Sequence, residues 1–129
     1  MIILLLVDDD EMSRELIRTR LTRLGYLVIT AINAKEGIQA AREESPNLIL
    51  MDLCMPEMDG FEAAKQLKTN GATAHIPILA ISGLNTAVDV RRAIRAGCDS
   101  FQTKPVNLAS LHIKIRRLVW NAAGNDVPK

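Results

Sequence analysis

Five side chains that can bind a cation or a phosphoryl group lie at the downstream ends of strand-like, largely apolar segments. They are Asp8, Asp9, Asp52, Ser82 and Lys104. In an open α/β sheet, ligands bind outside the carboxyl ends of parallel strands, so side chains from distant parts of the chain would meet in one crevice. Carboxylates that lie close together repel one another unless a hard cation joins them, and Mg²⁺ prefers carboxylates, waters and phosphate oxygens. The set therefore predicts metal-assisted phosphoryl chemistry.

The segments that must position these side chains alternate between strand-like and helix-like patterns. We expect strands at Ile2–Val7, Tyr26–Ala31, Leu48–Met51, Ile78–Ile81 and Phe101–Thr103. Three of them are continuous apolar runs, which is typical of parallel strands covered by helices on both faces. Because strand-helix-strand crossovers are right-handed, the predicted fold is α/β and flavodoxin-like: a (βα)₅ doubly wound parallel sheet with strand order 2-1-3-4-5.

Apolar residues at helical spacing predict a helix after each strand. The expected core-facing residues are, in chain order, Met12, Leu16, Leu21 and Leu24; Ala34, Ile38 and Ala41; Phe61, Ala64 and Leu67 or Lys68; Val90, Ala93 and Ile94; and Leu108, Leu111, Ile115, Leu118 and Val119. Gly25 and Gly97 are expected helix stops, since glycine adopts the left-handed conformation that often follows a helix. Asn33 with Glu36 resembles a capping box, and Asn107 is placed to cap the last helix.

The composition indicates one domain whose net charge is close to zero. The chain has 129 residues, 48% of them hydrophobic, which suits a single buried core. Lysine and arginine total 16 against 15 aspartates and glutamates, so the net charge of +1 does not mark a nucleic-acid or membrane binder. The opening run Ile2–Val7 is too short for a signal peptide or a membrane span, and we expect a cytoplasmic protein. Residues 1–121 form the predicted domain, and residues 122–129 a flexible tail or the stub of a linker.

Four segments carry a resemblance to a known family. LLLVDDDEMSR, LILMDLCMPEMDG, ILAISG and FQTKPV resemble, in order and spacing, the response-regulator receiver domain of two-component signalling, and the resemblance covers residues 2 to about 120. It implies that Asp52 is the phosphoacceptor and that Asp8 and Asp9 hold Mg²⁺ together with Asp52 and the backbone carbonyl of Cys54. It also implies that Ser82 binds the phosphoryl group and that Lys104 pairs with it.

Each implied role has a physical reason. Asp52 would attack phosphorus to form an acyl phosphate, so its carboxylate must be ionised and in line with the leaving group. Asp8 and Asp9 supply negative charge to the metal, which neutralises charge that spreads over the phosphoryl oxygens. Lys104 offers a compact cation to one of those oxygens. In this family the peptide bond before the residue that corresponds to Pro105 is typically cis, which points the lysine into the site.

The resemblance also implies a switch. Phe101 occupies the family's aromatic switch position, and a phosphoryl group that draws Ser82 inward would open space for its ring. The output is then a changed surface on helix four, strand five and helix five, which we expect to bind a downstream protein target. A histidine kinase or a histidine phosphotransferase is the expected phosphoryl donor. The protein is thus expected to be a signalling switch that catalyses only its own phosphorylation and dephosphorylation.

Six basic residues concentrate near that expected output surface: Arg91, Arg92, Arg95, Lys114, Arg116 and Arg117. They form either a docking patch for a partner or a set of solvated cations that favour the helix dipoles. Direct DNA binding is not expected, because no aromatic residues are interleaved with these basic residues and no helix-turn-helix segment is present.

The cysteines lie in different predicted units without a spacing typical of zinc or disulfide sites, so we expect reduced thiols. Cys54 lies two residues after Asp52 and is either a small packing thiol or an oxidation sensor. In receivers, Cys54 and Leu84 correspond to positions that border the path of the hydrolytic water. Since neither side chain positions water well, we expect slow self-dephosphorylation.

Other protein classes fit less well. A haloacid-dehalogenase-like phosphatase also forms an aspartyl phosphate at a strand end, but it normally needs a second aspartate where this chain has Cys54. A flavodoxin-like cofactor binder needs amides for a phosphate in the first loop, where Asp8 and Asp9 would repel it. Because the first strand begins at residue 2, a free-standing regulator is favoured. A receiver domain excised from a hybrid histidine kinase or a multidomain regulator would have the same sequence features.

Overall fold

A five-stranded parallel sheet forms the centre of the protein. The computed structural model describes residues 1–55, 58–83 and 86–124. The strands are β1 (Ile3–Val7), β2 (Leu27–Ala31), β3 (Leu48–Asp52), β4 (Ile78–Ser82) and β5 (Ser100–Thr103). They pair in the order β2-β1-β3-β4-β5, with every pair parallel. The predicted fold class and strand order are confirmed. Leu84, whose side chain is expected to border the path of the hydrolytic water, lies outside the described residues.

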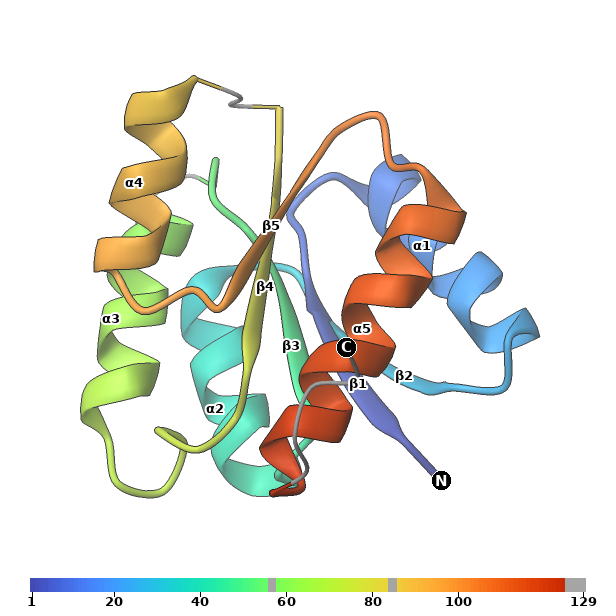
Figure 1. The fold of residues 1–129 in the computed structure, drawn as a ribbon, viewed down its shortest axis with the longest axis horizontal. Coiled ribbons are helices and arrows are strands. Elements are labelled where there is room, and N and C mark those ends of the chain that lie inside the picture. Colours follow the sequence, from blue (N-terminus) through green and yellow to red (C-terminus); the bar gives the residue numbers. More distant parts are fainter. Residues whose placement is uncertain (56–57, 84–85, 125–129) are drawn as a thin grey trace.

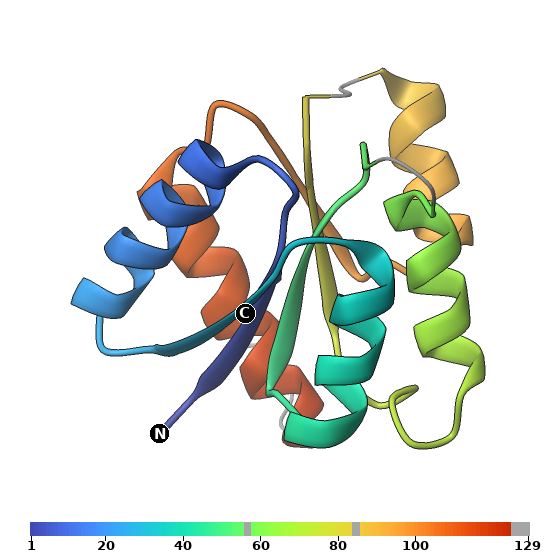
Figure 2. The same ribbon diagram turned by 180° about the vertical axis from the view of Figure 1, so that it is seen from behind.

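Helices cover both faces of the sheet (Figure 1). They are α1 (Glu11–Arg23), α2 (Ala34–Glu44), α3 (Gly60–Thr69), α4 (Ala87–Arg95) and α5 (Leu108–Ala122). The view from behind confirms that α1 and α5 lie on one face and that α2, α3 and α4 lie on the other (Figure 2). Within the described part of the chain, none of the helices is long and apolar enough to cross a membrane.

The central strands are buried on both sides, as their continuous apolar sequences predict. In β1, Leu4 and Leu6 face α1 and α5, whereas Leu5 and Val7 face α2 and α3. Successive side chains of a strand point to opposite faces, so each apolar strand contributes to two separate cores. The sheet is therefore held rigidly between two helical layers, and its carboxyl-terminal edge becomes a stable platform for polar side chains.

The predicted helix ends match the structure. Asn33 Oδ1 accepts a hydrogen bond from the Glu36 N–H at 2.7 Å, and Asn107 Oδ1 accepts one from the Ser110 N–H at 2.9 Å. Gly25 and Gly97 have φ angles of 98° and 105°, the left-handed conformation expected after a helix. These local signals fix where α2 and α5 start and where α1 and α4 stop.

The buried face of α1 differs from the predicted one. Met12 and Leu16 are 82% and 53% exposed, whereas Ile17 and Leu21 are buried against the sheet. The two buried residues are one helical turn apart, so a narrow stripe through them is enough to hold the helix on β1 and its neighbours. On α4, Ile94 is likewise exposed and Ala93 is the buried residue.

A half-buried lysine joins three segments at the end of the sheet opposite the aspartates. The Nζ atom of Lys68 donates to the Ile76 carbonyl at 2.8 Å and lies 3.0 Å from Oδ2 of Asp99. The same carboxylate oxygen accepts the Ile78 N–H at 2.9 Å. This network ties α3 to the start of β4 and to the turn before β5.

We expect Lys68→Met to lower the free energy of unfolding by about 1–3 kcal/mol, because it leaves the buried Ile76 carbonyl without this donor and removes the ion pair with Asp99. Urea unfolding measures the change. Lys65→Met, an exposed site on the same helix, serves as the control and should shift stability by no more than about 0.5 kcal/mol. Equal effects of the two substitutions would contradict the assigned role of Lys68.

The two thiols should differ sharply in reactivity. Cys54 is exposed and Cys98 is buried, and burial raises the pKa of the Cys98 thiol to about 12. Since the thiolate is the reactive species, iodoacetamide at mildly alkaline pH should label Cys54 in the folded protein and Cys98 only after unfolding. Peptide mass mapping reads out the labelled position, and rapid native labelling of Cys98 would contradict this burial.

Candidate functional site

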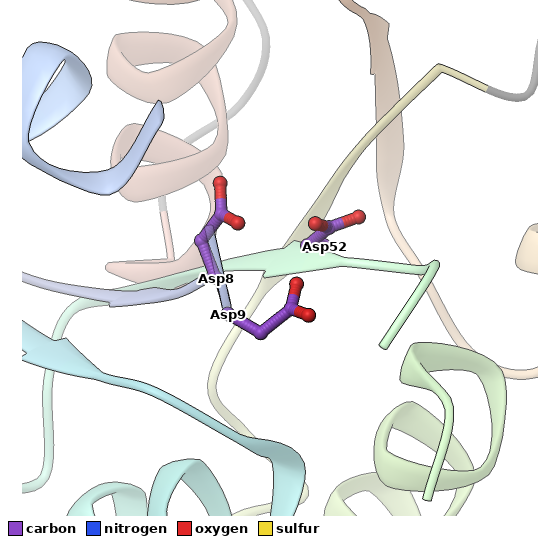
Figure 3. Close-up of side chains that lie close together, drawn as sticks. All are labelled: Asp8, Asp9 and Asp52. Atoms are coloured by element: carbon purple, nitrogen blue, oxygen red, sulfur yellow. The ribbon is translucent and has the colours of Figure 1, made fainter. Parts of the chain in front are cut away.

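Three carboxylates meet at the carboxyl-terminal edge of the sheet (Figure 3). Asp8 and Asp9 follow β1, and Asp52 is the last residue of β3. One oxygen from each carboxylate lies within 4.8 Å of the others. Asp8 and Asp52 are 1% and 6% exposed, whereas Asp9 faces solvent. The neighbouring strands β1 and β3 thus bring together side chains that are far apart in sequence.

Lys104 supplies the positive charge of this cluster. Its Nζ lies 3.0 Å from Oδ2 of Asp8 and 3.4 Å from Oδ2 of Asp52. The Lys104 N–H donates to the Ser82 carbonyl at 2.9 Å, which holds the residue after β5 against the end of β4. The Lys104–Pro105 peptide bond is cis, as the family resemblance implies. One ammonium group therefore bridges two buried carboxylates of like charge.

The electrostatics of the two buried carboxylates differ. Burial raises the pKa of Asp52 to about 6, against the opposing effects of the Cys54 N–H and of Lys104. Burial also acts to raise the pKa of Asp8, but hydrogen bonds from the Asp10 N–H and from Lys104 outweigh it and hold that pKa below its usual range. For Lys104, burial is outweighed by the two carboxylates, which raise its pKa. A cation at the cluster would favour the ionised form of Asp52.

The turn after β3 is folded tightly around Asp52. Oδ1 of Asp52 accepts the Cys54 N–H at 3.0 Å, and the Gly60 N–H donates to the Leu53 carbonyl at 3.1 Å. A Cβ atom at Gly60 would overlap the backbone carbonyl oxygen of Asp52 and lie 2.6 Å from the Leu53 Cα. The start of α3 therefore approaches Asp52 at a distance that only glycine permits.

Ser82 and Phe101 lie on one face of two adjacent strands. Ser82 is the buried last residue of β4, and its Oγ lies 3.8 Å from the Sγ of Cys54. Phe101 pairs with Ala80 in the β4–β5 register and packs against the core beneath α2 and α3. Because residues two apart on a strand point to the same face, the Ser82 hydroxyl and the Phe101 ring share that face.

The six basic residues near α4 and α5 fall into two groups. The guanidinium of Arg92 lies 3.9 Å from the centre of the Phe61 ring and 3.5 Å from Oδ2 of Asp59. Lys114 donates to the Phe101 carbonyl at 2.7 Å and to Oε1 of Gln102 at 3.0 Å. The remaining four, Arg91, Arg95, Arg116 and Arg117, are exposed. Two of the six cations thus make contacts within the fold, and all of the six except Lys114 are exposed.

Two features near the cluster were not predicted from the sequence. Arg14 Nη1 donates to the backbone carbonyl of Asp8 at 2.9 Å. Met12 and Leu16, exposed on α1, line a groove of about 680 Å³ that also includes Lys104 and Pro105. The sequence signal for the groove is that α1 carries more apolar residues than its narrow buried stripe uses. For Arg14 the signal is its place in the first turns of the helix that follows Asp9.

The donor set fits a hard divalent cation. Asp8, Asp9 and Asp52 offer carboxylate oxygens at close range, and an oxygen-only set with an exposed side suits Mg²⁺, which keeps several waters. Lys104 partly neutralises the cluster and is the only basic side chain among the described residues that is ion-paired to it.

The comparisons with known proteins agree with this geometry. The family model of the response regulator receiver domain matches residues 4–116. The polar-differentiation response regulator DivK of Brucella anthropi is 35% identical over 104 residues, which span 81% of this chain and 85% of DivK. The transcriptional regulatory protein AfsQ1 of Streptomyces coelicolor is 34% identical over 116 residues, which span 90% of this chain and 50% of AfsQ1. The chain spans about half the length of several curated relatives that it matches.

A solved structure shows the same architecture. The receiver domain of the sensor histidine kinase PA1611 from Pseudomonas aeruginosa PAO1, with a magnesium ion coordinated in its active-site cleft, has a TM-score of 0.85 and 26% identity. The match covers 91% of this chain and 96% of that one. The strand order, the acidic cluster, the lysine after β5 and the family match lead to one conclusion: this chain belongs to the response regulator receiver domain family of two-component signalling.

Proposed function

We propose that this protein is a phosphorylation-controlled switch in which Asp52 accepts a phosphoryl group from a histidine kinase or a histidine phosphotransferase. The observation that carries the proposal is the contact of Lys104 with both Asp8 and Asp52, within a cluster that Asp9 completes. A lone aspartate at a strand end has many uses. An aspartate beside two further carboxylates and a bridging ammonium fits phosphoryl transfer far better.

The transfer is a displacement at phosphorus. A carboxylate oxygen of Asp52 forms a bond to phosphorus while the bond from phosphorus to the donor imidazole nitrogen breaks, and the electron pair of that bond stays on the nitrogen. Mg²⁺ held by Asp8, Asp9, Asp52 and the Cys54 backbone carbonyl would supply positive charge to the phosphoryl oxygens. Lys104 is close enough to Asp52 to exchange its carboxylate contact for a phosphoryl oxygen, and the Ser82 hydroxyl would donate to another.

The switch acts through the shared face of β4 and β5. An added phosphoryl group brings roughly −1.5 to −2 charges and new acceptor oxygens, which would draw the Ser82 hydroxyl inward. The Phe101 ring then moves into the space that Ser82 leaves, and Lys114 connects the backbone of Phe101 to α5. A coupling of roughly 1–3 kcal/mol between the site and the surface formed by α4, β5 and α5 would change the affinity for a downstream protein several-fold.

We propose further that residues 1–121 form the receiver domain of a free-standing cytoplasmic regulator. The match to DivK along most of its length supports this assignment. The alternative, a receiver domain that belongs to a hybrid histidine kinase or a multidomain regulator, is supported by relatives such as AfsQ1 that are about twice as long. The phosphorylation chemistry is the same in both cases.

The first test is the intact mass of the protein after incubation with acetyl phosphate. We expect a single phosphoryl adduct on the wild type in the presence of Mg²⁺ and none after Mg²⁺ removal with a chelator, because the phosphoryl charge is then not neutralised. Asp52→Asn should carry no adduct. A folded wild-type protein that gains no adduct, or one that is modified equally after Asp52→Asn, would contradict the proposal.

The lifetime of the phosphoryl group is predicted to be long. Cys54 has a thiol 3.8 Å from the Ser82 hydroxyl, and a thiol is a poor hydrogen-bonding partner for an attacking water. Cys54→Asn should speed phosphoryl loss, by about tenfold, because an amide both donates to and accepts from water. Cys54→Ala, which adds no polar group, is the matched control and should keep the slow rate. If Cys54→Asn loses the phosphoryl group at the wild-type rate, this position does not set the lifetime.

A further inference from the structure

Arg14 completes the set of hydrogen bonds that hold Asp8. The Asp8 N–H donates to the Ala31 carbonyl at 3.1 Å, and Oδ1 accepts the Asp10 N–H at 3.0 Å. Oδ2 accepts from Lys104, and the backbone carbonyl accepts from Arg14 Nη1 at 2.9 Å. Every polar group of this buried residue thus has a partner, and each partner comes from a different residue.

The carbonyl contact has a geometric consequence for Asp9. The Asp8 carbonyl and the Asp9 N–H belong to one planar peptide unit, so a donor that holds the carbonyl oxygen also fixes the rotation of that unit. Among the described residues, the β1–β2 ladder ends at Val7 and Ala31 and the β1–β3 ladder ends at Val7 and Met51, so Asp8 lies beyond both ladders. The Arg14 guanidinium, together with the Asp10 N–H that binds Oδ1 of Asp8, therefore restrains the direction in which the Asp9 side chain leaves the backbone.

We propose that Arg14 is a positioning residue of the metal site: it fixes the Asp8–Asp9 peptide so that both carboxylates face Asp52. The inference rests on the proposed function, since it concerns the cation that the three carboxylates would share. Arg14 acts through the backbone of Asp8 and is not itself expected to contact the metal or the phosphoryl group.

The positive charge of Arg14 has the opposite effect on Mg²⁺ affinity from its positioning role. A guanidinium near the cluster repels a divalent cation, so a purely electrostatic role predicts tighter Mg²⁺ binding once the charge is removed. Arg14 is partly exposed, and solvent screens this repulsion. The Asp8 carbonyl is buried and would lose a charge-assisted hydrogen bond. Residues that orient metal ligands typically change affinity by about 10–100-fold when they are replaced, so we expect positioning to dominate.

The test is the Mg²⁺ dissociation constant by isothermal titration calorimetry, a readout that does not require phosphoryl transfer. We expect Arg14→Met to weaken Mg²⁺ binding by about tenfold, and Arg14→Lys, which keeps the charge and one donor, to recover part of the loss. Arg18→Met is the matched control on the same helix. Arg18 pairs with Glu15 at 2.7 Å on the exposed side of α1 and should leave the affinity within about twofold of wild type.

The acetyl phosphate reaction separates positioning from a general loss of structure. In Arg14→Met the Mg²⁺ concentration for half-maximal phosphorylation should rise by the same factor as the Mg²⁺ dissociation constant. The rate at saturating Mg²⁺ should stay close to that of wild type. Unchanged or tighter Mg²⁺ binding in Arg14→Met overturns the inference. If Arg14→Met does not fold, Arg14→Gln takes its place under the same criteria. A wild-type protein that binds no Mg²⁺ instead contradicts the proposed function itself.

Discussion

The repulsion among three carboxylates is the constraint on which the rest of this site depends. Two of them are buried, so little water screens their charges. Burial, with a further contribution from Asp8, raises the pKa of Asp52 to about 6 despite the opposing effects of the Cys54 N–H and Lys104. The Lys104 ammonium reduces this repulsion through its contacts with Asp8 and Asp52. One lysine does not neutralise three carboxylates, and the remaining negative charge creates a demand for a cation. A cation would reach the cluster from solvent without any change of fold, since Asp9 is exposed.

The fold must hold these charges together, and it does so through the ends of its strands. Neighbouring strands β1 and β3 carry the aspartates, and the lysine follows β5 but is held against the end of β4 by its own N–H. Two apolar cores, one on each face of the sheet, hold the strands in place, so the repulsion between the carboxylates does not separate the strand ends. In the proposed switch, the same rigidity would pass a small displacement of Ser82 to Phe101, because both side chains lie on one face of paired strands.

The sequence was sufficient to predict what depends on local patterns and on topology. The five strands, their order, the caps at Asn33 and Asn107 and the convergence of Asp8, Asp52 and Lys104 all follow from periodicity and from the geometry of parallel sheets. The buried face of α1 could not be predicted in this way. Met12, Leu16 and Ile17 are all apolar, so the sequence pattern does not distinguish residues that face the core from residues that line a groove. The contacts of Arg14, Arg92 and Lys114 were also missed, since a long side chain reaches a backbone carbonyl or a ring in ways that spacing does not encode.

A crystal structure of the protein with Mg²⁺ and beryllofluoride, a phosphoryl mimic, tests the central claim most directly. Our account predicts one Mg²⁺ among Asp8, Asp9 and Asp52, the beryllofluoride on an Asp52 oxygen, and Lys104 Nζ moved from Asp52 to a fluorine. A structure in which Mg²⁺ and beryllofluoride bind elsewhere, or in which Lys104 keeps both of its carboxylate contacts while the cluster stays empty, would contradict the account.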